Sequence, residues 1–552
     1  MSLAPSANIA RHLSEMAARQ PNRVALKIPR GRTASGEIDY LTLSFVELHA
    51  EVDAWCGRLT SSGVRRGDRT LVMVQQGLPL IAAAFALFKL GAVPVIIDPG
   101  MGLKSFLACV QRSLPRALIG IPLAQFVSRV ARRTFATVKV RVSASRSLTA
   151  RLAPPRASAS SPSIADVCAV DPADLAAILF TSGSTGAPKG VCYEHGMFES
   201  QIRLIRETYG IQPGEIDLPM LPIFALFNPA LGMTTVVPEI DPRRPAAVDP
   251  LKIVQAIQQE NITNSFGSPT LWRIIGDHCV AQNITLPSLR RVLCAGAPVP
   301  ATLWTSSRLW MPNGQLHSPY GATEALPVSS ISADEIARVS GIGACVGRPV
   351  SPNQVKIITI TDAPIASLQD AHELPRREIG EIIVAGPTVT TGYDAAPDAT
   401  AAAKIAGSAA APSSTVWHRM GDCGYLDDDG RLWFCGRKVE RVETSEGTLF
   451  TEPCEQVLRT HPNVARCALI GLGIRGQQQP ALVIESTLPQ RKDLMEFARE
   501  LRALAKANLA TEAITRFYFH PKLPVDVRHN AKIHRLALAR WATQARVYKV
   551  AS

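Results

Sequence analysis

A segment rich in hydroxyl groups and glycines carries the strongest chemical signal in the sequence. Residues 179–190 read Leu-Phe-Thr-Ser-Gly-Ser-Thr-Gly-Ala-Pro-Lys-Gly and continue an apolar stretch, Ala176–Phe180, that predicts a buried strand. In a loop of this kind backbone N–H groups converge, hydroxyls donate to oxygen anions and a lysine adds positive charge. The loop is not a Walker A motif, because two residues separate Gly186 from Lys189. The segment therefore predicts a phosphate-binding site of another kind.

Two downstream segments suit the base of a nucleotide. Residues 294–298 read Cys-Ala-Gly-Ala-Pro after a predicted strand, and residues 318–324 read Ser-Pro-Tyr-Gly-Ala-Thr-Glu. A purine can lie on the backbone at Gly296 and Ala297 while the ring of Tyr320 covers its other face. Taken alone, Tyr320 would suit a core position better than a cofactor site. The two segments together favour the nucleotide.

A metal ion completes this interpretation. Glu324 offers carboxylate oxygens to Mg²⁺, with the hydroxyl of Thr185 as a partner, because Mg²⁺ bridges phosphates with few protein ligands.

The three segments resemble, in order and over nearly the whole chain, the motifs of the adenylate-forming superfamily, which includes acyl-CoA synthetases, luciferase and the adenylation domains of peptide synthetases. The resemblance implies ATP and Mg²⁺ as cofactors and an acyl-adenylate as the product of a first reaction.

The resemblance also implies the fold and the domains. It predicts an α/β protein with a large N-terminal domain of α/β subdomains with mixed sheets, and a small, mobile α+β lid domain. Residues 1–437 would bind ATP and the acyl group, and residues 438–552 would form the C-terminal lid that carries Lys532. Glu440 falls at the expected hinge, although the usual Lys-Asp pair of the family is replaced there by Val439-Glu440.

The resemblance assigns roles to individual residues. The nucleotide would be bound by Thr181, Ser182, Gly183, Ser184, Thr185, Gly186, Lys189, Gly296, Ala297, Pro298, Tyr320, Gly321, Ala322, Thr323, Asp422 and Arg437. Within this set Asp422, which also suits a turn, matches a ribose-binding carboxylate, and Arg437 matches an arginine that contacts ribose or phosphate. Lys532, Glu324 and Thr185 would be catalytic. A cation such as Lys532 between the substrate carboxylate and the α-phosphate neutralises two anions that must approach each other.

One departure from the family pattern bears on the second reaction. CoA ligases commonly have a Phe-His pair after Leu-Pro, whereas Ala225 stands in the position of that histidine. Phe224, Ala225 and Phe227 would line an acyl pocket, although they also suit an ordinary core. The segments 97–102, 224–229 and 526–532 are similar to those of the olefin β-lactone synthetases of bacterial long-chain hydrocarbon synthesis.

That subfamily resemblance implies a specific reaction. A long-chain 2-alkyl-3-hydroxy acid is adenylated with release of diphosphate, and its own hydroxyl then attacks the carbonyl, which gives a β-lactone and AMP without CoA. His195 and His317 are the candidate bases for the hydroxyl. Two alternatives stay open: a long-chain acyl-CoA ligase, and a nucleotide-binding scaffold without activity, against which the intact Lys532 and Glu324 argue. The resemblance also suggests a complex with neighbouring enzymes of the olefin pathway.

Length and composition indicate a globular protein larger than one small binding module. The chain has 552 residues with 46% hydrophobic and 19% charged residues, which is typical of a globular protein. Its net charge is +13, but the basic residues are not gathered into short runs, so nucleic acid is not an expected partner.

The cellular compartment is predicted from the cysteines and the start of the chain. Eleven cysteines without a C-x-x-C pair and a start without a signal peptide predict a cytoplasmic protein. The most apolar stretch, Leu78–Ile97, contains prolines and a lysine and predicts a buried helix and strand, not a membrane span.

The elements that must position these residues follow from short apolar runs that alternate with helical patterns. Strands are predicted at Thr70–Val74, Ala92–Ile97, Ala117–Ile119, Arg291–Leu293, Arg431–Cys435, Ala465–Leu472 and Ala481–Ser486, and helices at Leu80–Leu90, Lys104–Ser113, Glu452–Thr460 and Arg491–Leu509. This alternation indicates parallel strands joined by helices. Two stretches rich in Ala, Pro and Ser, Ser143–Ser163 and Ala395–Ser414, are predicted to be surface loops or insertions.

Overall fold

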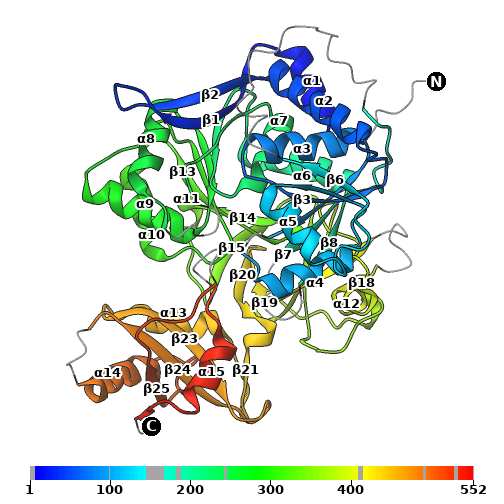
Figure 1. The fold of residues 1–552 in the computed structure, drawn as a ribbon. Helices are drawn as coiled ribbons and strands as arrows, with labels where there is room; N and C mark the ends of the chain where they lie inside the picture. Colours follow the sequence, from blue (N-terminus) through cyan, green and yellow to red (C-terminus); the bar gives the residue numbers. More distant parts are fainter. Residues whose placement is uncertain are drawn as a thin grey trace.

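Four β-sheets with helices packed on them carry the fold (Figure 1). The structure is a computed structural model that describes residues 7–98, 100–144, 167–181, 188–241, 244, 247–407, 415–488, 493–526 and 532–550. Within these residues the sheets have fourteen, six, four and two strands. The mixed α/β class expected from the sequence is confirmed.

The six-stranded sheet ends at the hydroxyl-rich loop. Its order is β6 (Val140–Ser143), β5 (Ala117–Gly120), β3 (Arg69–Met73), β4 (Val93–Ile97), β7 (Leu175–Thr181) and β8 (Lys189–Glu194). All neighbours are parallel except β7 and β8, which form an antiparallel pair. The helices of this region are α3 (Leu78–Lys89), α4 (Leu103–Ser113), α5 (Pro122–Val130) and α6 (His195–Tyr209). The predicted alternation of strands and helices is confirmed, and α3 is buried over nearly its whole surface.

The fourteen-stranded sheet carries the other predicted motifs. Its strands run in the order β16 (Gln354–Ile358), β17 (Gly380–Ala385), β19 (Val416–Leu426), β20 (Leu432–Arg437), β15 (Ala344–Pro349), β14 (Ala325–Ser332), β13 (Gln315–Ala322), β12 (Arg291–Cys294), β11 (Asn264–Gly267), β9 (Ile216–Pro219), β10 (Thr234–Val236), β1 (Val24–Arg32) and β2 (Ile38–Ser44), and β18 (Lys404–Ala406) pairs with β19. From β13 to β1 the neighbours are parallel, and the pairs outside that stretch are antiparallel. The sheet therefore brings segments from both halves of the chain into one surface.

Helices from the first and middle parts of the chain cover this sheet. They are α1 (Arg11–Arg19), α2 (Phe45–Ser61), α7 (Asn228–Leu231), α8 (Pro250–Glu260), α9 (Pro269–Ala281), α10 (Ala301–Trp310), α11 (Ala333–Ile336) and α12 (Pro397–Ala403), with 3₁₀ turns η2 (Pro222–Leu226), η4 (Leu368–Asp370) and η5 (Lys438–Glu440). The start of α2 shows how the sequence sets a helix boundary. The side chain of Ser44 accepts a hydrogen bond from the backbone N–H of Glu47, and the side chain of Glu47 accepts one from the backbone N–H of Ser44. Between α9 and α10, Trp272 and Trp310 stack in a fully buried core.

One of the two predicted loop regions is corrected by the structure. Residues 397–403 form α12, which Pro397 starts at the first helical turn, and residues 404–406 form β18. Ile405 is fully buried in a cluster with Trp417, and this packing outweighs the loop-like composition. Residues 408–414 lie outside the described residues, as does most of the other predicted loop, from residue 145 to residue 163.

The last part of the chain has a sheet and cores of its own. A four-stranded sheet joins β23 (Val464–Leu472), β24 (Gln479–Ser486), β25 (Arg516–Phe519) and β26 (Tyr548–Lys549), and β21 (Val442–Glu443) pairs with β22 (Thr448–Leu449). The helices are α13 (Thr451–Leu458), α14 (Leu494–Lys506) and α15 (Arg535–Ala542). Two hydrophobic clusters of this part contain only residues from Val442 onward. In Figure 1 this orange and red part lies below the remainder of the molecule.

Among the described residues, no helix is both long enough and apolar enough to cross a membrane.

Candidate active site

Three of the predicted nucleotide-binding residues meet at one carboxylate. The hydroxyl of Tyr320 on β13 donates to Asp422 Oδ2 at 2.7 Å, and Arg437 Nη1 on β20 donates to Asp422 Oδ1 at 2.7 Å. Asp422 lies on β19 directly opposite Arg437 in the strand register, so the sheet itself sets this ion pair. The sequence distance from Tyr320 to Asp422 is 102 residues, and only the order of strands in the large sheet brings them together.

The carboxylate of this cluster lies between a neutral donor and a cationic donor. The carboxylate of Asp422 raises the pKa of Arg437, and burial together with Asp422 raises the pKa of Tyr320 well above its usual value. The phenol therefore stays protonated and remains a donor. A carboxylate has about four acceptor positions, and two are used here, so Asp422 retains acceptor capacity for hydroxyl groups.

A second cluster joins the predicted metal ligand to the hydroxyl-rich loop. Glu324 lies in the turn between β13 and β14, and its Oε1 accepts a hydrogen bond of 2.7 Å from the hydroxyl of Tyr393. The ammonium group of Lys189 lies 4.8 Å from the centre of the Tyr393 ring. Burial and the charge of Glu324 raise the pKa of Tyr393, so it too is a neutral donor. Sequence analysis missed Tyr393, for which the hydroxyl and glycine run Thr390-Thr391-Gly392 was the available signal.

A buried lysine supports this second cluster from behind. Lys404, on β18, donates to the carbonyl of Thr390 and, at 3.1 Å, to its hydroxyl. The backbone N–H of Thr390 in turn donates to the carbonyl of Glu324 at 2.9 Å. Burial lowers the pKa of Lys404 to about 7. Lys404 was missed because it lies in the stretch predicted to be a loop.

The hydroxyl-rich segment connects the two strands of an antiparallel pair. Phe180 faces Gly190, and Thr181 faces Lys189. A Cβ on Gly190 would lie 2.7 Å from the Phe180 ring, so only glycine fits there. Ser182, Gly183, Ser184, Thr185 and Gly186 lie outside the described residues.

The two segments predicted to hold the base lie at strand ends. Gly296 follows β12 with φ of +99°, in the region that favours glycine, and it is exposed. Ala297 is half-buried and Pro298 is exposed. The last residues of β13 and the following turn, Gly321, Ala322 and Thr323, are half-buried, and the carbonyl of Thr323 accepts a bond of 2.5 Å from Tyr193.

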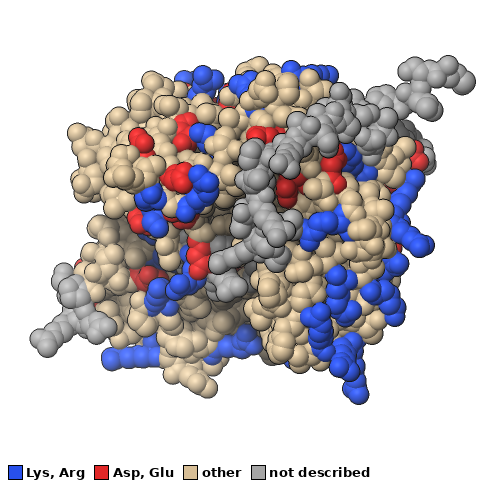
Figure 2. Space-filling view, turned by 45° about the horizontal axis from the view of Figure 1, so that its top comes forward, with Lys and Arg blue, Asp and Glu red and all other residues tan. Residues whose placement is uncertain are grey.

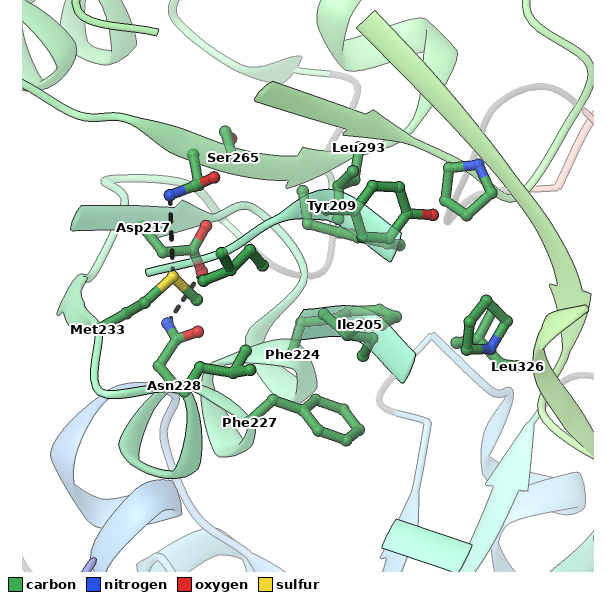
Figure 3. A pocket seen from close by; sticks show the side chains of 16 residues that line it. Ile205, Tyr209, Asp217, Phe224, Phe227, Asn228, Met233, Ser265, Leu293 and Leu326 are labelled. Atoms are coloured by element: carbon green, nitrogen blue, oxygen red, sulfur yellow. Dashed lines mark hydrogen bonds between the residues drawn. The ribbon is translucent and has the colours of Figure 1, made fainter. Parts of the chain in front are cut away.

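An apolar pocket opens between η2, α6 and the large sheet (Figure 3). Its volume is about 590 Å³, including the part that opens to solvent. The lining residues are Ile205, Tyr209, Ile211, Asp217, Phe224, Phe227, Asn228, Leu231, Met233, Asn264, Ser265, Phe266, Leu293, Pro319, Leu326 and Pro327. Phe224 and Phe227, the two phenylalanines expected to line an acyl pocket, belong to this lining, and Phe224 stacks on Phe266 at 3.7 Å between ring centres. Ala225 does not belong to this lining, because it is buried in the adjacent core.

One side of the pocket is polar, which sequence analysis did not foresee. Figure 3 shows Asp217, Asn228 and Met233 gathered on the side opposite Leu326. Asn228 Nδ2 donates to Asp217 Oδ2 at 2.9 Å and to Thr235 Oγ1 at 2.9 Å. Burial raises the pKa of Asp217 to about 7. The pocket therefore contains a carboxyl group that is partly protonated at neutral pH.

The two histidines considered as bases do not line this pocket. His195 is buried at the start of α6, where its Nδ1 accepts a 3.4 Å bond from the Ile9 backbone and its ring contacts Phe88. His317 packs edge-on against Tyr209. Burial lowers the pKa of each to about 4. Both are accounted for by core packing, because a sequence position near a motif does not fix the direction of a side chain.

The residues expected to form the hinge and to act as the catalytic lysine lie in the last part of the chain. Glu440 accepts a bond of 2.9 Å from Arg535 Nη1, which ties η5 to α15. Beside it, the ammonium group of Lys438 donates to the fully buried Glu381 at 3.0 Å. The backbone N–H of Lys532 donates to Asp526 Oδ1 at 2.8 Å, and Val525 pairs with Ile533.

Comparison with known proteins identifies the class. Residues 13–394 match the family described as AMP-binding enzyme. The chain belongs to this family of AMP-binding enzymes.

Two full-length relatives narrow the class. The chain is 46% identical to the olefin β-lactone synthetase of Stenotrophomonas maltophilia (strain K279a) over 97% of its length and 98% of the relative. It is 45% identical to the olefin β-lactone synthetase of Xanthomonas campestris pv. campestris (strain ATCC 33913) over 98% of both chains. In fold the chain is similar to the o-succinylbenzoate coenzyme A synthetase MenE of Bacillus subtilis, whose structure was solved in complex with ATP and magnesium ion. The TM-score is 0.74, and the sequences are 21% identical over 96% of this chain and 98% of MenE.

Proposed function

We propose that this protein is an ATP-dependent β-lactone synthetase of long-chain olefin biosynthesis. It adenylates the carboxyl group of a long-chain 2-alkyl-3-hydroxy acid and releases diphosphate. The β-hydroxyl oxygen then attacks the acyl carbonyl, the bond to AMP breaks, and the hydroxyl proton is lost as the four-membered ring closes. The single observation that carries the proposal is the identity of 46% and 45%, over essentially the full length, with two olefin β-lactone synthetases.

The cluster around Asp422 is the proposed ribose site. The carboxylate is held in place by Tyr320 and Arg437 and retains acceptor positions for the two ribose hydroxyls. The left-handed backbone and the exposure of Gly296 support a close approach of the adenine base to that segment. The hydroxyl-rich loop that ends at Lys189 is the proposed site of the phosphates.

Glu324 is the proposed ligand of Mg²⁺, together with Thr185. In the described part of the chain, no Lys, Arg or His lies within ion-pairing distance of Glu324, and its one hydrogen-bonded side-chain partner there is the neutral hydroxyl of Tyr393. A carboxylate without a cationic partner fits a hard cation. When bound, Mg²⁺ supplies positive charge to the phosphates of ATP. Tyr393 would hold Glu324 in place through its hydrogen bond.

The last part of the chain is the proposed lid. We place its boundary after residue 437, and its separate cores support movement as a unit. The network of Lys438 and Glu381 on one side, and of Glu440 and Arg535 on the other, supports a hinge at η5. Movement of the lid would bring Lys532 to the substrate carboxylate and the α-phosphate, where its charge offsets the repulsion between them.

The apolar pocket is the proposed site of an alkyl chain. Its lining by Phe224, Phe227 and Phe266 supports this role, because burial of methylene groups favours binding by about 0.8 kcal/mol each.

The proposed cellular compartment is the cytoplasm, which eleven cysteines without disulfide bonds support. Association with neighbouring enzymes of the olefin pathway remains part of the proposal on the ground of the family resemblance.

A product assay tests the function. The purified protein is incubated with ATP, Mg²⁺ and a 2-alkyl-3-hydroxy fatty acid, with and without CoA. The proposal expects a β-lactone, AMP and diphosphate in equal amounts without CoA. An acyl thioester formed only with CoA would identify a CoA ligase instead.

A lysine variant separates catalysis from binding. Lys532→Ala is expected to lower adenylate formation by about two to three orders of magnitude, because one preorganised charge at the reacting atoms is worth about 3–4 kcal/mol. ATP binding, measured by calorimetry, should largely persist. The matched control is Lys522→Ala, an exposed lysine ten positions earlier. Unchanged turnover in Lys532→Ala would contradict its role.

A further inference from the structure

Helix α5 presents large apolar side chains to solvent. Leu123, Phe126 and Val130 are 58%, 63% and 67% exposed. Their spacing of three and four positions places them on one face of the helix, where they form a stripe. The buried positions are instead small or polar: Ala124, Gln125 and Ser128. A surface helix ordinarily shows the opposite arrangement, so packing within this chain does not account for the stripe.

Hydrogen bonds fix this orientation of α5. Gln125 Nε2 donates to the carbonyl of Val142 at 2.9 Å, on β6 at the edge of the six-stranded sheet. The hydroxyl of Ser128 accepts a bond of 3.3 Å from Arg141 Nε. Turning the helix to bury its apolar stripe would break these hydrogen bonds.

Helix α4 adds to the same surface. Residues of α4 and α5 belong to one hydrophobic cluster on one face of the six-stranded sheet, so the two helices cover the same side of it. Leu103 at the start of α4 is 65% exposed, and Leu114 after its end is 56% exposed. Of the fourteen exposed large hydrophobic residues in the described part of the chain, five therefore lie between residues 103 and 130.

This apolar surface is surrounded by positive charge. Residues 100–144 contain eight Lys and Arg and neither Asp nor Glu, a segregation that a search for short basic runs overlooks. Arg129, Arg132 and Arg133, at and beyond the end of the stripe, are exposed, and within the described residues none of them lies at ion-pairing distance from an acidic side chain. Figure 2 shows Lys and Arg gathered at the lower right of the molecule with hardly any acidic side chain among them.

We infer that α4 and α5 form a docking surface for an anionic lipid bilayer. The stripe of Leu123, Phe126 and Val130 would enter the boundary between headgroups and acyl chains, while the arginines contact lipid phosphates. Exposed apolar side chains in a segment whose charged residues are all cationic suit an anionic bilayer. A second copy of the chain would oppose like charges, and a nucleic acid would leave the apolar stripe without a partner. The inference goes beyond the proposed function and does not depend on it.

Vesicle flotation with the full-length protein tests the inference. We expect binding to phosphatidylcholine vesicles that contain about 30% phosphatidylglycerol, weaker binding to pure phosphatidylcholine, and release as salt rises from about 0.1 M to about 0.5 M. Two triple variants, Leu123→Ser/Phe126→Ser/Val130→Ser and Arg129→Glu/Arg132→Glu/Arg133→Glu, should each weaken binding at least about tenfold.

A matched variant on another helix controls for general loss of charge and apolar surface. Leu509, Arg499 and Lys506, on and after α14, are also exposed, so Leu509→Ser/Arg499→Glu/Lys506→Glu should bind vesicles like the unmodified protein. All variants should adenylate a water-soluble hydroxy acid at the same rate, which shows that they fold.

Three outcomes would overturn the inference. They are absence of binding to either vesicle, binding that the two α5 variants leave unchanged, and capture of a purified acidic protein through α5 without vesicle binding. Should the triple variants fail to fold, Phe126→Trp gives an independent readout. Its added fluorescence should be quenched by brominated lipids in anionic vesicles, and unquenched fluorescence would contradict insertion.

Discussion

Asp217 and Asp422 are both aspartates on strands of the same sheet, and both are nearly fully buried, with 6% and 5% of their surface exposed. Asp422 has a guanidinium and a phenol as donors. Asp217 has the amide of Asn228 and otherwise an apolar pocket, and burial raises its pKa to about 7. The two aspartates are therefore buried to the same degree but differ in their partners.

The difference corresponds to the two groups that these regions would bind, the ribose of ATP and an alkyl chain. An ionised and fixed carboxylate suits hydroxyl groups that must be held in one place, as in a ribose. A carboxyl group that can be neutral is compatible with an alkyl chain nearby, because an unpaired charge in an apolar pocket is costly. The chain thus places one residue type beside a cationic donor in one region and beside a neutral amide in the other.

The strongest test of the comparison removes the charge of Asp422. Asp422→Asn leaves Arg437 without its anionic partner and is expected to lower kcat/KM for ATP by about a hundredfold to a thousandfold, or about 3–4 kcal/mol. The measurement is diphosphate release at varied ATP. The matched control is Asp217→Asn, for which KM for ATP should be unchanged. Equal losses in both variants would mean that the two aspartates do not differ in role.

The next test uses the pH dependence of stability. Since the folded-state pKa of Asp217 is raised to about 7, the folded state binds an extra proton between about pH 4 and pH 7, and this contribution to stability is lost as pH rises through that range. The free energy of unfolding should fall by up to about 1.4 kcal/mol per pH unit there through this group. Urea unfolding at several pH values should show a flatter profile for Asp217→Asn. Identical profiles would contradict a raised pKa.

A smaller change weakens the Asp422 cluster without removing its charge. Tyr320→Phe keeps the aromatic ring but removes one hydrogen bond to the carboxylate, which is worth about 1.5 kcal/mol. We expect KM for ATP to rise about tenfold, with little change in kcat. Tyr425→Phe, on another face of β19, is the control. A drop in kcat alone would argue that Tyr320 acts on the reaction step and not on binding.

The smallest expected effect concerns the carboxylate outside this comparison, Glu324. Tyr393→Phe removes its 2.7 Å hydrogen bond while the ring beneath Lys189 remains. The Mg²⁺ concentration for half-maximal adenylation should rise about threefold to tenfold, because one hydrogen bond is worth about 1 kcal/mol. Titration with Mg²⁺ at saturating ATP measures this. Glu324→Gln should show a larger shift in the same direction, and an unchanged Mg²⁺ requirement in both variants would contradict the assignment of the metal.

Much of the fold was predictable because its signals are local. Apolar periodicity predicts a helix over Leu80–Leu90. The observed helix α3 starts two residues earlier and ends one residue earlier. The stretch that became α12 and β18 was predicted wrongly, because its composition is that of a loop and the contact of Ile405 with Trp417 is not visible in composition. His195 and His317, suggested as bases by their positions near motifs, do not line the apolar pocket, because a position in the sequence does not fix the direction of a side chain.

The sequence by itself determined the family, the order of the motifs and the class of chemistry, because these depend on residue types at short spacing. Only the tertiary structure decided that Asp422 meets Tyr320 across 102 positions, that Tyr393 meets Glu324 across 69, and that Asp217 faces an apolar pocket. The physical reason is that burial and charge pairing come from contacts between distant strands. Local patterns predict strands, but they do not predict which side chains the sheet places against one another.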